Sequence, residues 1–262
     1  MGSPDYTDDL RLAHMLADNS DSITMSRFKA GDLKVSTKPD LSEVTDADLA
    51  VEEAIRRTLS KARPRDAVHG EEGDDTGWGP RRWVVDPIDG TANFVRGVPV
   101  WATLIALMVE DTVVAGVVSA PALGRRWWAH AGQGAFTGPS LLRGQQVRVS
   151  RVGNLADASM SYSSVSGWVD SGRGQAFVDL LRDCWRTRAY GDFWSYMLVA
   201  EGAVDLALEP ELALHDMAAL DIIVREAGGR FSNINGDDGV AGPGALCTNG
   251  LLHEELVTRL SQ

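Results

Sequence analysis

The stretch WVVDPIDGTANF, residues 83–94, places Asp86 and Asp89 three residues apart at the end of an apolar run. The run predicts a buried strand, and because Pro87 cannot continue a hydrogen-bond ladder, we expect the chain to turn there. Gly90 and Thr91 then open a segment whose backbone N–H groups can bind a phosphate, while paired carboxylates suit a hard cation such as Mg²⁺. The spacing alone fits an acidic turn with an Asp N-cap equally well.

Apolar runs on both sides of this stretch predict strands. Residues 83–87, 101–109, 112–120 and 125–136 are separated by short polar segments, which predicts an antiparallel meander. The second half alternates instead between strand candidates at 159–164, 187–190, 204–208 and 245–249 and helix candidates near 172–185, 192–202, 215–227 and 251–260. Helices layered on two sheets are the simplest architecture that buries all of these faces, so we expect a mixed α/β fold.

Helical periodicity dominates the first sixty residues. Leu10, Ala13 and Leu16, followed by Ile23 and Phe28, indicate one long helix or a broken pair. Residues 44–60 predict a second helix. In this helix we expect Thr45 as the N-cap, Asp46 and Asp48 in the first turn, and Leu49, Ala54, Ile55 and Leu59 facing inward.

Composition excludes several classes of protein. The chain has 262 residues, of which 44% are hydrophobic, and a formal charge of −12 without a basic run, which argues against a nucleic-acid partner. Its 2 cysteines are too few for a disulfide framework, which favours a reducing compartment. The N-terminal residues lack the pattern of a signal peptide, and no apolar run approaches the length of a membrane span. We therefore expect a cytoplasmic protein without a membrane partner.

Three further acidic positions are ambiguous one by one. Glu71 lies in the segment HGEEGDD, residues 69–75, which taken alone reads as a solvated charge run. Asp216 opens the amphipathic segment 214–227 and Asp46 opens the helix 44–60, so each also fits an ordinary helix N-terminus. None of these signals is specific by itself.

Taken together, these motifs resemble those of the inositol monophosphatase family across almost the whole chain. The resemblance rests on GEE at 70–72, DPIDGTANF at 86–94 and HDMAALDIIVREAGG at 215–229. It implies a layered αβαβα sandwich, a single catalytic domain over 1–262 and a homodimer. Within that domain it implies a metal-binding half over about 1–150 and a substrate-binding half over about 151–262. Residues 93–107, 120–136 and 188–210 are most similar to the bacterial histidinol-phosphate phosphatases within this family.

The resemblance also implies roles for the acidic residues. Glu71, Asp86 and the carbonyl of Ile88 are expected to hold one Mg²⁺, and Asp86, Asp89 and Asp216 a second. A third, weaker Mg²⁺ beside Glu71 is part of the same expectation, and Glu71 is expected to steer the attacking water. The proton of that water is expected to leave through Thr91, oriented by Asp46, while the N–H groups of Gly90 and Thr91 hold the phosphate.

Specificity is expected to lie in the second half. Histidinol phosphate carries an ammonium group and an imidazole, so Asp192 and Glu209 are candidates to bind its organic part, with Arg188 nearby. The alternative is that Arg188 and Asp192 form only a structural ion pair. His215 stands where the family has Trp, and we expect this change to affect substrate fit more than metal binding.

The expected function is thus a Mg²⁺-dependent phosphomonoesterase acting on L-histidinol phosphate. An inositol 1-phosphate or broad sugar phosphatase is the alternative within the same chemistry. A catalytically weak regulatory protein that binds metal and phosphate is the alternative from another class.

Overall fold

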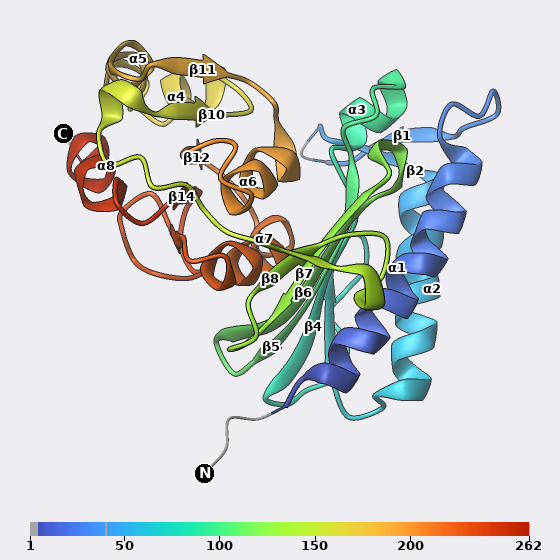
Figure 1. Ribbon diagram of the computed structural model, residues 1–262. Coiled ribbons are helices and arrows are strands. Elements are labelled where there is room, and N and C mark those ends of the chain that lie inside the picture. Colours follow the sequence, from blue (N-terminus) through green and yellow to red (C-terminus); the bar gives the residue numbers. More distant parts are fainter. Residues whose placement is uncertain (1–4, 40, 262) are drawn as a thin grey trace.

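Helices and sheets alternate in five layers in the computed structural model, which describes residues 5–39 and 41–261 (Figure 1). Helices α1 (Thr7–Arg27) and α2 (Asp46–Ala62) form one outer layer against a large sheet. Helices α6 (Asp192–Ala200) and α7 (Leu214–Glu226) lie between that sheet and a smaller one. The predicted αβαβα sandwich is confirmed. Residues 1–4, which belong to the segment predicted to lack a signal peptide, lie outside the described residues.

The large sheet has seven strands in the order β3-β4-β5-β6-β7-β8-β9. These strands are β3 (Ala67–Gly70), β4 (Arg81–Asp89), β5 (Ala102–Val109), β6 (Thr112–Ala120), β7 (Arg125–His130), β8 (Ala135–Thr137) and β9 (Gln145–Val147). All neighbours are antiparallel except β3 and β4, so the predicted meander is confirmed. The run 125–136 forms two strands rather than one, because Gly132 and Gly134, both with positive φ, allow a turn between them.

Side chains of the large sheet alternate between two cores. Leu104 and Ala106 of β5 are buried on the side of α7, while Ile105 and Leu107 are buried on the side of α1 and α2. Successive side chains of a strand point to opposite faces, so a continuous apolar run is required when both faces are covered. This is why β5 reads as an unbroken hydrophobic segment.

The first outer layer differs from its prediction in two details. The N-terminal periodicity corresponds to a single helix, α1. Leu49 of α2 is 53% exposed rather than inward, because the buried face of that helix is built on Val51, Ile55 and Leu59. A short hairpin, β1 (Val35–Thr37) with β2 (Glu43–Thr45), joins α1 to α2.

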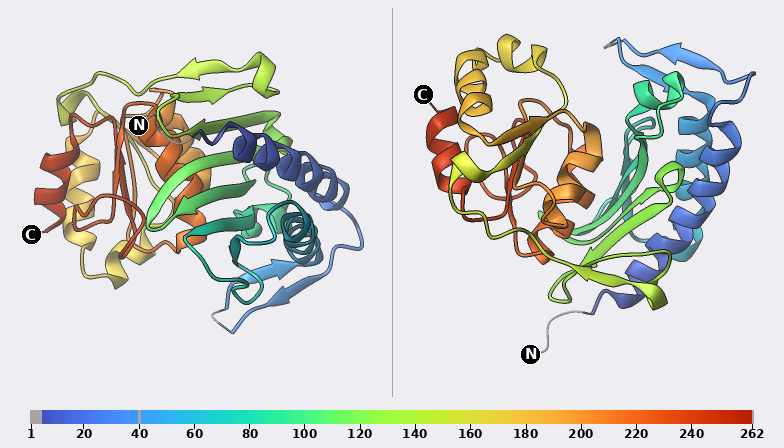
Figure 2. Two further views of the ribbon diagram at one scale, coloured as in Figure 1. Left: turned by 90° about the horizontal axis from the view of Figure 1, so that it is seen from below. Right: turned by 45° about the horizontal axis from the view of Figure 1, so that its top comes forward.

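The smaller sheet has the order β11-β10-β12-β14-β13 and is covered on its outer side by α4, α5 and α8 (Figure 2). Its strands are β10 (Ser159–Ser161), β11 (Arg186–Arg188), β12 (Leu206–Glu209), β13 (Arg230–Ser232) and β14 (Ala245–Thr248). The covering helices are α4 (Ser166–Asp170), α5 (Gly174–Asp183) and α8 (His253–Leu260). The short strand β13 and helix α4 were not predicted.

The remaining elements are short. They are helix α3 (Thr91–Arg96) and the 3-10 turns η1 (Pro121–Leu123), η2 (Leu141–Arg143) and η3 (Leu155–Asp157). Within residues 5–39 and 41–261, no helix combines the length and apolar character needed to cross a bilayer. Cys184 and Cys247 are both buried and free.

Candidate metal centre and active site

A bulge at the end of β4 brings Asp86 and Asp89 to the same side of the sheet. Asp86 pairs with Leu104 and Asp89 with Ala102, so three residues of β4 advance opposite two of β5. In a regular strand, side chains three residues apart point to opposite faces, and the extra residue reverses this relation. The ladder therefore does not end at Pro87 as predicted. The strand bulges there instead and continues to Asp89.

Three carboxylates meet at this point. Oxygens of Asp86, Asp89 and Asp216 lie within 4.8 Å of one another, with Asp216 supplied by the first turn of α7. Burial raises the pKa of Asp86 well above its usual range, and the charges of Glu71 and Asp89 raise it further. Burial likewise raises the pKa of Asp89, with added repulsion from Asp192 and Asp216. The cluster is electrostatically unfavourable unless a cation compensates it.

The donor set of this cluster fits a hard cation. Asp86 is 2% exposed, and its Oδ1 atom accepts no hydrogen bond from any described residue. A buried carboxylate oxygen left without a donor is costly in a folded protein. The cluster offers only oxygen ligands, which Mg²⁺ and Ca²⁺ prefer over nitrogen and sulfur.

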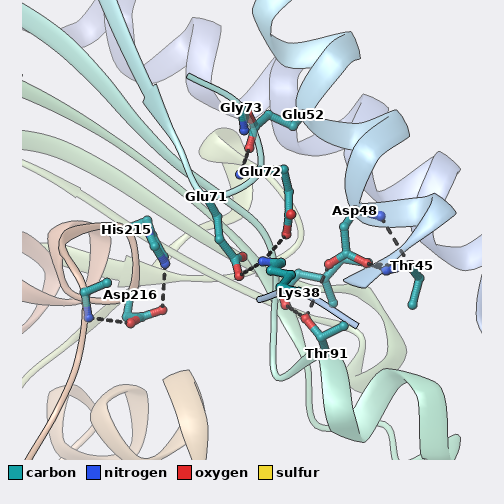
Figure 3. A network of polar contacts seen from close by, with 12 residues as sticks. Lys38, Thr45, Asp48, Glu52, Glu71, Glu72, Gly73, Thr91, His215 and Asp216 are labelled. Atoms are coloured by element: carbon teal, nitrogen blue, oxygen red, sulfur yellow. Dashed lines mark hydrogen bonds and ion pairs between the residues drawn. The ribbon is translucent and has the colours of Figure 1, made fainter. Parts of the chain in front are cut away.

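Glu71 lies at the edge of the cluster, directly after β3. Its Oε1 atom is 2.6 Å from Lys38 Nζ, which also lies 2.7 Å from Glu72 Oε1 (Figure 3). Lys38 follows β1, so the hairpin between α1 and α2 supplies a positive charge to the two acids. Burial raises the pKa of Glu72 to about 7, although Lys38 opposes this shift. Lys38 thus compensates acids that would otherwise repel one another.

Thr91 hydrogen-bonds to a different acid from the one expected. Its Oγ1 lies 3.3 Å from Asp48 Oδ1 and 2.9 Å from the carbonyl oxygen of Ile88 (Figure 3). Asp46, which was predicted to orient Thr91, instead forms an ion pair with Arg27 at 2.8 Å. Asp48 takes the expected place of Asp46.

The geometry of α2 explains this correction. Residues two apart on a helix are separated by about 200°, so Asp46 and Asp48 face nearly opposite directions. Thr45 is the N-cap, as predicted, and its backbone N–H donates to Asp48 Oδ2 at 2.8 Å in a capping box. Burial raises the pKa of Asp48, against the hydrogen bonds from Thr45, which lower it.

Asp192 is held beside the cluster at the start of α6. Its backbone has φ of 48°, a strained value for a residue with a side chain. Asn93 Nδ2 donates to its carboxylate at 2.7 Å, and its own N–H donates to Ser163 Oγ at 2.9 Å. The next N–H, of Phe193, donates to Asp89 Oδ2 at 2.8 Å. One short segment therefore fixes both Asp192 and Asp89.

Glu209, at the end of β12, is a second acid near Asp192. It accepts a hydrogen bond from Tyr196 Oη at 3.1 Å. Burial raises its pKa to about 8, with repulsion from Asp192 as the next cause, and burial raises the pKa of Asp192 to about 6. Both acids therefore lie where a cationic group would relieve their repulsion.

The structure does not join Arg188 to these acids. Arg188 is exposed on the edge strand β11, and its Nη1 donates to the carbonyl oxygen of Thr187 at 2.7 Å. Within the described residues, no ion pair links it to Asp192, whose carboxylate is bound by Asn93 instead.

His215 lies against both Asp216 and His69. Its Nε2 is 3.7 Å from Asp216 Oδ1, and its ring stacks on that of His69 with centroids 6.1 Å apart. His69 Nδ1 lies 2.7 Å from Asp75 Oδ1, which fixes the orientation of that ring. A pair of imidazoles therefore forms one wall beside the cluster.

Sequence reasoning missed four residues that shape this site: Lys38, Asp48, Asn93 and Ser163. Asp48 had a usable signal, because Thr and Asp three residues apart at a helix start form a capping box, and Asn93 lies inside the motif at 86–94. Lys38 and Ser163 lie in irregular segments far from the motifs, and no local pattern marks them.

Comparisons with known proteins agree with this geometry. The model of the inositol monophosphatase family matches residues 6–262. A histidinol-phosphatase of Streptomyces coelicolor is 62% identical, covering 99% of both chains. A histidinol-phosphatase of Mycobacterium tuberculosis is 56% identical, covering 97% of this chain and 98% of the relative. Among solved structures, the Thermotoga maritima IMPase superposes with a TM-score of 0.86 at 30% identity, covering 97% of each chain.

Proposed function

Since the chain belongs to the inositol monophosphatase family, we propose that it is a Mg²⁺-dependent phosphomonoesterase that hydrolyses L-histidinol phosphate to L-histidinol and phosphate. The family assignment made from the three motifs is confirmed. Two relatives named histidinol-phosphatase, 62% and 56% identical over nearly their whole length, support the substrate. The observation that carries the proposal is the buried acidic cluster with Asp192 and Glu209 beside it.

Asp86, Asp89 and Asp216 are the residues that would hold Mg²⁺, with Glu71 and the carbonyl of Ile88 as further ligands. The unsatisfied Oδ1 of Asp86 supports this assignment. When bound, Mg²⁺ supplies positive charge for the phosphoryl oxygens and lowers the pKa of water. Without it, the carboxylates would repel a phosphate ester.

Thr91 and Asp48 provide a path for the proton of the attacking water. As the water oxygen bonds to phosphorus and the bond from phosphorus to the ester oxygen breaks, Thr91 Oγ1 accepts the proton of the water and gives its own to Asp48 Oδ1. The leaving ester oxygen takes up a proton from solvent and departs as the alcohol. The raised pKa of Asp48 makes it a better proton acceptor than an exposed carboxylate. Backbone N–H groups of Gly90 and Thr91, which follow Asp89 directly, bind the phosphate.

Asp192 and Glu209 bind the ammonium group of the substrate. Buried acids that repel one another gain from an added cation, and a charge-assisted hydrogen bond is stronger than a neutral one. Inositol and sugar phosphates bring hydroxyl groups but no positive charge. The paired acids therefore favour the amine, and the His69–His215 wall lies beside the same cluster.

The direct test compares phosphate release from L-histidinol phosphate and from inositol 1-phosphate, with Mg²⁺ and with excess chelator. We expect a strong preference for L-histidinol phosphate, and neither turnover nor ester binding in chelator. Equal rates, or a preference for inositol 1-phosphate, would support the sugar phosphatase alternative. Substantial ester binding in chelator would contradict the role of the metal.

We expect Asp192→Asn and Glu209→Gln to lower kcat/KM for L-histidinol phosphate about 10- to 100-fold. This follows from losing a hydrogen bond to a charged group, worth about 1.5–3 kcal/mol. Rates with inositol 1-phosphate should change much less, because that substrate has no ammonium group. Glu211→Gln, an exposed acid two residues from Glu209, is the control. An unchanged KM for L-histidinol phosphate in both variants would refute this recognition.

We also propose that the protein is cytoplasmic and forms a homodimer. Two free, buried cysteines are consistent with a reducing compartment. Trp185, 68% exposed beside the edge strand β11, offers apolar surface for an interface. Light scattering on the purified protein should give twice the mass of the chain.

A further inference from the structure

We propose that Glu52 of α2 is a positioning residue, which fixes Glu71 by binding the two peptide N–H groups that follow it. The inference rests on the proposed function, because Glu71 matters only as a ligand of the metal used in the reaction. Glu52 itself touches neither the acidic cluster nor Thr91 in the described contacts.

The carboxylate of Glu52 is fully engaged by the Glu71 loop. Its Oε2 accepts the N–H of Glu72 at 2.8 Å, and its Oε1 accepts the N–H of Gly73 at 2.9 Å (Figure 3). The first of these N–H groups belongs to the peptide that Glu71 itself begins. Holding that peptide plane fixes the backbone from which the side chain of Glu71 reaches the cluster.

Two glycines allow this close approach. A Cβ atom at Gly70 would lie 2.4 Å from the carboxyl carbon of Glu52, and one at Gly73 would lie 2.9 Å from its Oε1. Real Cβ atoms do not come so close to another heavy atom, so a side chain at either position would force the Glu52 carboxylate and the loop apart. The close approach of Glu52 therefore explains why both residues that flank Glu71-Glu72 are glycines.

Arg56 completes the arrangement one turn further along α2. Its Nε donates to Glu52 Oε1 at 2.8 Å, and its Nη2 donates to the carbonyl oxygen of Gly73 at 3.0 Å. The side chain of Glu52 is only 4% exposed, and Arg56 compensates its charge. The pair thus binds both the N–H and the C=O of Gly73, which holds the loop from two directions.

The same helix face carries Asp48. Asp48 and Glu52 are four residues apart, about one helical turn, and both are buried. Asp48 contacts Thr91, whereas Glu52 holds the loop of Glu71, so α2 sets the distance between the proton acceptor and a metal ligand. A general structural role for Glu52 would not require this alignment with the two parts of the site.

The test measures Mg²⁺ binding to the full-length protein by calorimetry, without any phosphate ester. We expect Glu52→Gln to raise the dissociation constant for Mg²⁺ about 10- to 100-fold, the usual effect of losing a group that orients a metal ligand. The amide group presents N–H donors to one of the two backbone N–H groups, so that contact is lost. Amide hydrogen exchange over residues 70–76 should accelerate. Glu53→Gln, which removes the same charge from an exposed neighbour, should change neither the dissociation constant for Mg²⁺ nor the rate of amide exchange.

Gly73→Ala provides a second variant that keeps Glu52 but forces its carboxylate and the loop apart, and we expect the same weaker Mg²⁺ binding. This variant tests the inference even if Glu52→Gln does not fold. A folded Glu52→Gln or Gly73→Ala protein that binds Mg²⁺ as the wild type does, with only a lower melting temperature, would overturn the inference. Failure of the proposed function would look different: the wild type would not hydrolyse L-histidinol phosphate, whereas these Mg²⁺ titrations would keep their predicted order.

Discussion

Asp86→Asn should bind Mg²⁺ poorly and lose turnover by a factor of about 10³ or more, yet be more stable than the wild type when metal is absent. Stabilisation of phosphoryl charge by metal ions is worth several kcal/mol, and about 4 kcal/mol corresponds to this factor. Asp86 lies at the centre of the cluster, so we expect its loss to affect every metal site that the cluster can form.

The gain in stability has a separate cause. The pKa of Asp86 is raised well above its usual range by burial and by neighbouring carboxylates, so its ionised form destabilises the metal-free fold. Asparagine removes that charge. As the pH falls through the raised pKa of Asp86 towards the ordinary aspartate pKa of 3.8, Asp86 of the wild type takes up a proton. The difference in stability between the variant and the wild type should therefore shrink. Thermal unfolding in chelator, from neutral to acid pH, measures this directly.

Asp111→Asn is the matched control, since it removes an exposed acid from the β5–β6 turn of the same sheet. We expect it to leave activity and Mg²⁺ binding unchanged. If Asp86→Asn kept wild-type turnover with saturating Mg²⁺, the assignment of the site would be wrong. If the wild type itself hydrolysed neither ester, the regulatory metal-binding alternative would gain support.

The residues of the acidic cluster could be predicted from the sequence because each lies in a short motif at the end of a strand or the start of a helix. Asp86 and Asp89 follow a continuous apolar run, and Asp216 precedes an amphipathic one. The bulge that turns Asp86 and Asp89 to the same side was not predictable. It depends on the register with β5, which residues 83–94 do not encode alone.

The second half of the chain shows where local patterns fail. Asp192 and Glu209 lie on different elements, and only the packing of α6 against β12 brings them near the cluster. Arg188 is four residues from Asp192 in the chain, which made it a reasonable neighbour. However, it lies on an exposed edge strand, whereas Asp192 begins a helix that turns inward. Proximity in sequence across a strand-to-helix junction says little about proximity in space.

Asp48→Asn should lower kcat by about 10²- to 10³-fold, within the usual range for losing a general acid or base, whereas Asp46→Asn should have little effect. The two variants remove the same charge from the same helical turn, and they differ only in the direction in which the replaced side chain points. Asp48 contacts Thr91, and Asp46 contacts Arg27. Mg²⁺ affinity should stay near the wild-type value in both, because neither residue belongs to the acidic cluster.

A purely structural role for Asp48 makes a different prediction. Asp48 also closes the capping box of α2, and because the amide oxygen of Asn can still accept from the Thr45 N–H, Asp48→Asn should change stability little in either case. If Asp48 accepts the proton through Thr91, activity of the wild type should fall as acid protonates Asp48, and this acid limb should vanish in Asp48→Asn. Thr91→Ala should lose a similar factor, and the double variant should be no slower than either single variant, since the two groups act as one unit. Additive losses would instead mean that Asp48 and Thr91 act separately, and that Asp48 serves only the helix.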